Sequence, residues 1–196
     1  MVRSEKTRQL IIEKTARIFN EKGYTGTYLS DLTDATGLTK GSIYGNFKDK
    51  NEVAIEAFRY NYKFQSEPIL RKIELEDNAV SKLLVFLEHY KLAYKPIFEN
   101  GGCAILNTAV DADNGNESLR TEVVKAIRGW HKRVADILTA GIEQKEIKPV
   151  NVEQWTYRML ALIEGSILLA KTLKDHTILL NNIDMLMCDV EQLAQE

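Results

Sequence analysis

The sequence predicts an all-α protein, and three observations support that prediction. Only 3 prolines and 11 glycines interrupt the 196 residues, so long segments contain no residue that breaks a helix. Apolar residues recur at three- and four-residue spacing, and clear alternating strand patterns are absent from the sequence. A composition of 44% hydrophobic and 28% charged residues is typical of a globular chain with one large or two small domains.

The first helix is predicted over residues 4–22, and Gly23 is expected to end it. The opposite side of this segment is charged, which is the pattern of an amphipathic helix. Its apolar face consists of Ile11, Ile12, Ala16 and Phe19.

The stretch Thr27–Lys50 predicts two short helices joined by only a few residues. Gly37 can adopt the left-handed conformation that ends the first of them, and Leu38 can anchor the turn in the core. The Thr39 hydroxyl can accept from the first free amides of the second, which covers about Lys40–Phe47. Two short helices around such a turn are typical of a helix-turn-helix motif.

The remainder of the chain predicts further helices, which brings the total to about nine. Asp49 and Glu52 have the spacing of a capping box, so a helix is expected from there to about Arg71. Pro68 is expected to kink or end that helix, and Pro96 to end the next one. The later helices are expected over residues 78–94, within the segment 101–115 that glycines bracket, and over residues 117–145, 152–173 and 178–194.

Charge is divided unevenly along the chain. Residues 1–63 contain 11 Lys and Arg against 8 Asp and Glu, a net charge of +3, and the other 133 residues contain 15 against 20, a net charge of −5. A basic N-terminal part on an acidic remainder is expected if one end meets phosphates.

The cysteines and the N-terminus indicate a cytoplasmic protein. Cys103 and Cys188 stand far apart, so we expect reduced thiols and not a disulfide scaffold. The first residues are charged throughout and lack a signal-peptide core, and the apolar runs elsewhere are too short to span a bilayer. We therefore expect no membrane contact.

These features resemble the TetR family of transcriptional regulators. The match over about residues 8–55, including TKGSIYGNFKDK, is specific because glycine, hydroxyl, tyrosine and the F-x-x-K step stand at fixed spacing. The rest of the chain resembles the family only in length and helix pattern. The resemblance implies a DNA-binding domain at residues 1–48 and a ligand-binding and dimerisation bundle at residues 49–196. It also implies a homodimer that binds a palindromic DNA operator and holds a small-molecule inducer.

The short recognition helix supplies most of the candidate DNA contacts. Its N-terminal end must enter the major groove, so Thr39, Lys40 and Ser42 are candidates for base edges or nearby phosphates, and Gly41 allows close approach. Tyr44 is expected to send its hydroxyl to a phosphate, as the matching tyrosine does in the family. The other candidates are Thr27, which we expect to cap the first helix of the motif, Tyr28, Asn46, Lys48 and Lys50.

Most of these residues also have a purely structural interpretation. Tyr44 could pack in the core, as Ile43 and Phe47 are expected to do, and Lys48 could be a solvated charge. Thr27 and Thr39 could serve only as helix caps. Asn46 could read an adenine or touch the DNA backbone, and the Lys50 ammonium at a helix start could meet a phosphate.

The C-terminal part offers an aromatic and polar set from which an inducer pocket could be built, although most of its members must also form the core. His89, His131 and His176 lack the spacing of a metal site. Cys103 is expected to pack as a small hydrophobe and not to act as a nucleophile, so we expect neither an enzyme nor a cofactor. The candidate ligand contacts are Phe86, Tyr90, Tyr94, Asn107, Trp130, His131, Trp155 and Met159.

The last two helices are the expected dimer interface. Apolar residues wrap most of residues 154–173, and Gly165 and Ser166 would allow another helix to approach closely. Burial on more than one side is expected of a helix with a partner in a second subunit, as in the family, or of a helix central to its own monomer. We therefore predict a ligand-responsive repressor that an inducer releases from its operator. The alternative is a helical adaptor protein that keeps the fold without DNA recognition.

Overall fold

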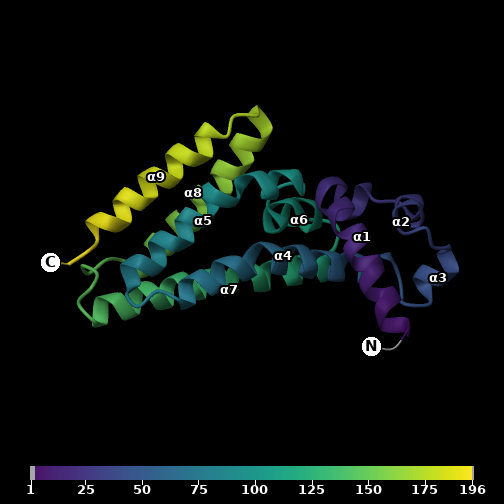
Figure 1. The fold of residues 1–196 in the computed structure, drawn as a ribbon, viewed down its shortest axis with the longest axis horizontal. Coiled ribbons are helices and arrows are strands. Elements are labelled where there is room, and N and C mark those ends of the chain that lie inside the picture. Colours follow the sequence, from purple (N-terminus) through teal and green to yellow (C-terminus); the bar gives the residue numbers. More distant parts are fainter. Residues whose placement is uncertain (1–2, 196) are drawn as a thin grey trace. The chain divides into compact units, whose positions relative to one another are not determined.

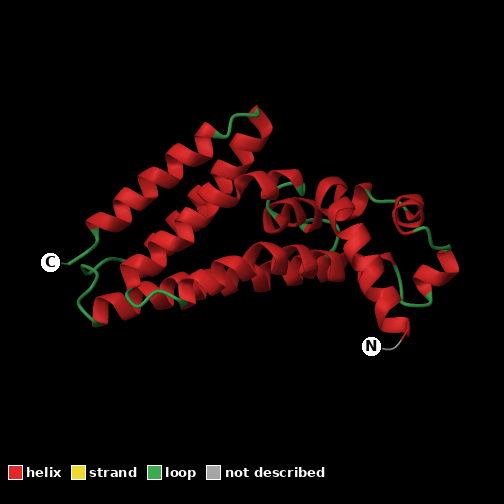
Figure 2. Cartoon of the chain, viewed as in Figure 1, coloured by secondary structure: helices red, strands yellow, loops and turns green. Residues whose placement is uncertain are grey.

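The computed structural model describes residues 3–195, which form nine helices joined by loops (Figures 1 and 2). The prediction of an all-α fold with an N-terminal helix-turn-helix and a helical C-terminal part is confirmed. An isolated β-bridge between Ile147 and Ala194 is the one extended pairing within the described residues. The helices are α1 (Arg3–Gly26), α2 (Leu29–Thr36), α3 (Lys40–Tyr44), α4 (Lys50–Glu74), α5 (Ala79–Glu99), α6 (Ala104–Ala112), α7 (Glu117–Glu143), α8 (Val152–Leu173) and α9 (Thr177–Gln192).

The chain divides into two units, which are described separately below. The first unit contains the residues up to Gln65 together with Asn100–Ala126, and the second contains Ser66–Glu99 and the residues from Ile127 onward. Helices α4 and α7 therefore each contribute one part to either unit.

Predicted and observed helix ends differ at the glycine and proline positions. Gly23 breaks α1 with φ 71° and ψ 175°, but one further turn follows it to Gly26. Pro68 lies inside α4 and does not end it. The prediction that Pro96 ends its helix is wrong, because α5 continues to Glu99. A proline removes one backbone donor, and the burial of Ile97 directly after it favours the continued helix.

The first unit is built around the apolar face of α1. Helix α1 packs against both α2 and α6. The predicted apolar residues Ile11, Ile12, Ala16 and Phe19 are all buried, as is Leu32 of α2. Burial of each large apolar side chain contributes roughly 1.5–3 kcal/mol, so this shared face holds the helix-turn-helix to α1.

The second unit is a helical bundle in which α9 packs against α5 and α8. Helices α8 and α9 form a hairpin closed by a short loop (Figure 1). Its interior consists of aliphatic and aromatic side chains, and two ion pairs, Lys91 with Asp184 and Arg158 with Asp189, join its helices at the surface. The largest fully buried side chains in this unit are Phe86, Leu83, Leu87, Leu138, Ile147, Met159, Ile163 and Ile167.

Candidate nucleic-acid interface

Helix α3 and its N-cap carry several of the predicted DNA contacts. The Thr39 hydroxyl accepts from the backbone amide of Ser42 at 3.2 Å, which confirms the predicted cap. Ile43 is fully buried and Phe47 nearly so, as predicted. With this side of α3 fixed in the core, Thr39, Lys40 and Gly41 at its N-terminal end lie exposed to solvent.

The turn before α3 has the geometry predicted from its glycine. Gly37 adopts a left-handed conformation with φ 68°, and its amide donates to the Thr33 carbonyl at 2.8 Å. A residue with a Cβ is disfavoured in that conformation. Gly37 therefore sets the angle at which α3 leaves α2.

Thr27 does not cap α2, so this prediction is wrong. Tyr28 occupies the N-cap position, and its backbone amide donates to Asp31 at 2.7 Å. The Thr27 hydroxyl instead donates to the carbonyl of Gly23 at 2.6 Å, and the residue is fully buried. The break in α1 leaves this carbonyl available, a feature that the local pattern around Thr27 does not show. Tyr28 itself is 68% exposed beside the start of α2.

Asp31 joins the same end of α2 to α1. It accepts from the Lys22 ammonium at 2.6 Å as well as from Tyr28. These bonds, that from Lys22 first, hold the pKa of the Asp31 carboxyl below its ordinary value. The carboxylate thus stays charged where it stabilises the N-terminus of α2.

Lys50 is engaged inside the first unit. Its ammonium donates to the carbonyls of Tyr24 at 2.7 Å and Thr27 at 2.8 Å and lies 4.1 Å from the centre of the Tyr24 ring. Burial lowers the pKa of the Lys50 ammonium, whereas the nearby Asp111 carboxylate acts to raise it. The side chain therefore closes the C-terminal end of α1, a role that its position at the start of a helix did not indicate.

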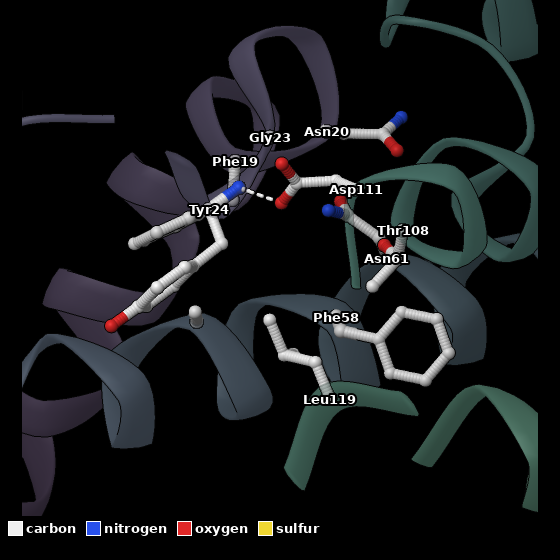
Figure 3. Close-up of a pocket in the computed structure, with 10 residues that line it drawn as sticks. Phe19, Asn20, Gly23, Tyr24, Phe58, Asn61, Thr108, Asp111 and Leu119 are labelled. Atoms are coloured by element: carbon white, nitrogen blue, oxygen red, sulfur yellow. Dashed lines mark hydrogen bonds between the residues drawn. The ribbon is translucent and has the colours of Figure 1, made fainter. Parts of the chain in front are cut away.

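Asp111 of α6 stabilises the break that Gly23 makes in α1 by accepting from backbone amides after it. Its carboxylate accepts from the Tyr24 amide at 2.5 Å (Figure 3) and, more weakly, from the Thr25 amide at 3.4 Å. A Cβ on Gly23 would lie 2.9 Å from the Asp111 side chain. Because Gly23 interrupts the helix, these amides lack their usual carbonyl partners, and the carboxylate replaces them.

The cavity beside Asp111 is too small for an inducer. It has a volume of about 10 Å³ and is shown in Figure 3, which is room for about one water molecule. Phe19, Phe58 and Leu119 form its apolar side, and Asn61 and Asp111 part of its polar side. The Asn61 amide donates to the Ala16 carbonyl at 2.7 Å. This region is consequently part of the support of α1.

Arg8 is a residue that sequence reasoning missed. Its guanidinium donates to the Asn46 carbonyl at 2.7 Å and to Glu52 at 2.8 Å, and lies 4.1 Å from the centre of the Phe47 ring. Glu52 also accepts from the Lys48 amide at 2.7 Å. That backbone bond, followed by the bond from Arg8, lowers the pKa of Glu52. The arginine thus fixes the segment after α3, which no local signal in the sequence marks.

Asn46 and Lys48 occupy this fixed segment. The Asn46 side-chain amide donates to the Ser42 carbonyl at 2.8 Å, and its oxygen accepts from the Ser4 hydroxyl at 3.2 Å. Lys48 is exposed, and Ser42 and Tyr44 are half-buried. The predicted DNA contacts thus differ in exposure: some are exposed, Ser42, Tyr44, Asn46 and Lys50 are half-buried, and Thr27 is buried. The exposed group comprises Tyr28, Thr39, Lys40, Gly41 and Lys48.

The candidate ligand contacts do not form a single cluster. Phe86 lies 5.3 Å from Trp130 and 5.6 Å from Tyr90, measured between ring centres. Tyr94 stacks on His176 at 5.2 Å. Met159 is fully buried, as expected of a core residue.

Two further candidates lie on α7 and α8. His131 lies 4.5 Å from Tyr157, and its buried Nε2 atom has no hydrogen-bond partner within the described residues. The Arg158 guanidinium lies 5.2 Å from the centre of the Trp155 ring. These rings form small groups in the second unit.

Asn107 belongs to the first unit and has internal partners. Its side-chain amide donates to the carbonyls of Asn20 at 3.0 Å and Gly101 at 2.8 Å. The Asn20 amide in turn donates to the Gly102 carbonyl at 3.1 Å. Asn107 therefore holds the glycine turn before α6, where Cys103 is buried at the N-cap position.

A metal site and a membrane-spanning helix were the other features sought among the described residues. Among residues 3–195, no three His, Cys, Asp or Glu side chains come together as a metal site would require. Over the same residues, no helix combines the length and apolar character needed to cross a lipid bilayer.

Comparison with known proteins identifies both parts of the chain. Residues 11–57 match the family model for bacterial regulatory proteins of the tetR family. Residues 79–185 match the model for the tetracyclin repressor-like C-terminal domain. The second match alone covers more than half of the chain.

Individual relatives agree over the full length. A crystal structure of a TetR-family transcriptional regulator from Cytophaga hutchinsonii is 38% identical, with a TM-score of 0.93, over 100% of this chain and 98% of that one. A TetR regulator from Chloroflexus aurantiacus is 31% identical, with a TM-score of 0.93, over 100% of this chain and 99% of that one.

A sequence relative shows the same extent of similarity. An uncharacterized HTH-type transcriptional regulator from Lactococcus lactis is 26% identical over 97% of this chain and 96% of its own length. These relatives are named as transcriptional regulators and not as enzymes. The chain therefore belongs to the TetR family of transcriptional regulators.

Proposed function

We propose that this regulator is a homodimeric repressor that binds a palindromic operator and is released from it by a small molecule. The observation that supports DNA binding most directly is the exposed N-terminal end of α3, held in place by the buried Ile43 and Phe47. A rigid support is needed for base recognition, because small displacements of a recognition helix misplace every contact along it.

Within this proposal, the contact residues have different tasks. Lys40 and Ser42 read base edges at the N-terminal end of α3, and Thr39 keeps its cap while its hydroxyl faces the DNA. Tyr44, Tyr28 and Lys48 contact phosphates, which position the protein without reading sequence. Because Lys50 is bonded to two carbonyls, we assign it to the support of the motif.

The proposed dimer uses the surface of α8 and α9. Leu168, Leu169 and Leu173 of α8 are about half exposed or more, as are Tyr157 and Met185. Large apolar side chains gathered on a helix hairpin favour a protein partner. A closed two-fold dimer buries the same surface of both subunits and would present two α3 helices to successive major grooves.

Relatives support a ligand-controlled repressor as the working hypothesis. The repressor DhaR from Mycobacterium sp. is 28% identical over 72% of this chain. Two proteins with the same fold, 20% and 21% identical, have been solved with choline and with stearoyl-CoA. Because these two ligands differ in chemical class, the ligand class of this chain has to be inferred from its own residues.

Release is proposed to follow from a change in α4. This helix contributes Lys50 and Glu52 to the motif and continues into the second unit. A ligand that prefers one conformation of the second unit shifts the population toward that conformation. A tilt of the N-terminal part of α4 would then move the two α3 helices out of register with the operator.

The test begins with selection of bound sequences from random double-stranded DNA by the purified protein. Recovery of a palindromic sequence is expected, and an anisotropy titration should then show affinity that falls steeply with salt concentration. If no sequence is enriched and no salt-dependent binding is found, the repressor function is refuted, and the alternative of a helical adaptor protein without DNA recognition is favoured.

Two variants separate the proposed contacts. Tyr44→Phe should weaken binding to all operator variants alike, because the lost hydroxyl meets a phosphate. Lys40→Ala should change the preference among sequences, because that side chain reads bases. Identical effects of both variants on every operator sequence would refute the assigned roles.

A further inference from the structure

A pocket of about 360 Å³ opens on the second unit, formed by the last turns of α5 and α8 and the loop before α9. Small-molecule sites typically have volumes of about 300–1,000 Å³. This pocket is therefore large enough for a small organic ligand, and the proposed DNA contacts do not include any of its residues.

Aromatic rings form one wall of this pocket. The Tyr94 ring lies on the His176 imidazole with 5.2 Å between centres and an angle of 10° between planes. Phe98 meets the Tyr94 ring edge-on, at 6.0 Å and 73°. Tyr94 and Phe98 are half-buried and His176 is exposed. A planar ring could stack on such a wall, since aromatic pairs favour stacked and edge-on arrangements.

Lysines outnumber acidic residues in the lining of this pocket. Lys95, Lys171 and Lys174 line the pocket, and Glu99 is the single acidic residue in its lining. The Lys95 ammonium lies 6.0 Å from the centre of the Tyr94 ring. Across residues 3–195, neither Lys95 nor Lys174 forms an ion pair with a carboxylate. Lysines are favoured at helix C-termini in general, but here they also border an aromatic surface.

Lys174 stands at the C-terminal end of α8, where the chain enters the loop that borders the pocket. Lys174 ends α8 in a left-handed conformation with φ 56°. Glycine or asparagine is the usual residue at such a position, because a longer side chain is disfavoured there. The side chain of Lys174 lines the pocket.

We infer that this pocket binds an aromatic anion, meaning a planar ring system that carries a carboxylate, sulfonate or phosphate group. The ring packs against the aromatic wall that Tyr94, Phe98 and His176 form, and the anionic group pairs with Lys95 and Lys174. That such a molecule is also the signal of the regulator rests on the proposed function.

Direct binding tests this inference with two dyes that share one ring system. Anilinonaphthalene sulfonate carries the anionic group, phenylnaphthylamine lacks it, and both become brighter in apolar surroundings. Lys174→Asn keeps a residue suited to the left-handed backbone and removes the charge. This variant should bind the sulfonate about tenfold more weakly, the loss expected for one hydrogen bond to a charged group, and the neutral dye unchanged.

The matched control is Lys145→Asn, since Lys145 is also an exposed lysine in a left-handed conformation, with φ 61°, and does not line the pocket. It should leave both affinities unchanged. Tyr94→Leu should weaken both dyes, because it removes the stacking surface. Circular dichroism of each variant establishes that it is folded. Equal sulfonate affinity in Lys174→Asn and the unmodified protein would overturn the inference.

Operator binding separates this inference from the proposed function. Dye-free protein that fails to bind any selected DNA would refute the repressor but leave the pocket assignment intact. Conversely, an operator complex unaffected by saturating sulfonate that occupies the pocket would refute its role as a signal site. Weaker operator binding in the presence of the dye, abolished by Lys174→Asn, would support both.

Discussion

The interactions that stabilise the interior of each unit differ in kind between the two units of this regulator. In the first unit, polar side chains that reach backbone atoms of other segments support the apolar core, as Lys50, Asp111, Arg8 and Asn61 do. In the second unit, apolar side chains fill the interior and ion pairs lie at the surface. An unpaired buried polar group costs about 1–3 kcal/mol, so the first unit should be sensitive to changes of single atoms. The second should respond mainly to changes in volume.

The largest effect is expected from Gly23→Ala in the first unit. The left-handed φ of 71° is strained for alanine, and the new Cβ would approach the Asp111 side chain. We expect a loss of about 3 kcal/mol in the free energy of unfolding, measured by urea unfolding with circular dichroism. Gly115→Ala is the control, because no atom lies within 4 Å of its added Cβ. A loss for Gly23→Ala no larger than that of the control would show that neither the left-handed φ nor the approach to Asp111 makes this position depend on glycine.

The two lysines of the motif offer a sharper test of the same idea. Lys50→Met leaves the carbonyls of Tyr24 and Thr27 without this donor and should cost about 2 kcal/mol of stability. Lys40→Met should leave stability unchanged, weaken binding to the operator about tenfold and change the preference among operator sequences, because that side chain is assigned to base edges. Urea unfolding and anisotropy titration are run on both variants. If Lys50→Met has normal stability but binds DNA weakly, Lys50 contacts a phosphate and does not support the motif.

The features that depend on local sequence patterns could be predicted, whereas contacts between distant segments could not. The N-cap at Thr39, the left-handed Gly37 and the bounds of residues 152–173 depend on local patterns, and the structure agrees with each. The role of Lys50 depends on carbonyls freed by the break at Gly23, more than twenty residues earlier in the chain. The contacts of Asp111 and Arg8 likewise join distant segments, so spacing in the sequence could not reveal them.

Acid should destabilise the two units in different pH ranges. Burial lowers the pKa of His89, in the second unit, to about 4. Between the ordinary value of about 6.5 and this value, the unfolded chain binds a proton that the folded chain does not. The free energy of unfolding should therefore fall as the pH falls through this range.

In the first unit, the hydrogen bond from Arg59 lowers the pKa of Glu122 to about 2. Its stabilising contribution should be lost as the pH falls from the ordinary pKa of about 4.5 toward that value. Urea unfolding as a function of pH measures both ranges. His89→Gln should flatten only the upper range and Glu122→Gln only the lower. A variant that leaves its own range unchanged would contradict the corresponding assignment.

The smallest effect on the monomer is expected from Gly165→Ala in α8. No atom lies within 4 Å of the added Cβ, and alanine favours a helix over glycine by about 1 kcal/mol. A slightly more stable monomer is therefore expected, measured by urea unfolding at low protein concentration. If another α8 approaches closely at Gly165 in the dimer, sedimentation should show weaker association. Unchanged association would place the close contact elsewhere on α8 and α9.

Both tryptophans of the chain, Trp130 and Trp155, belong to the second unit. Intrinsic tryptophan emission therefore follows the environment of that unit alone, whereas the helical signal in circular dichroism comes from the whole chain. A thermal transition visible in circular dichroism but silent in emission would be the separate melting of the first unit. Coincident transitions in the two signals would instead show that the two units unfold together.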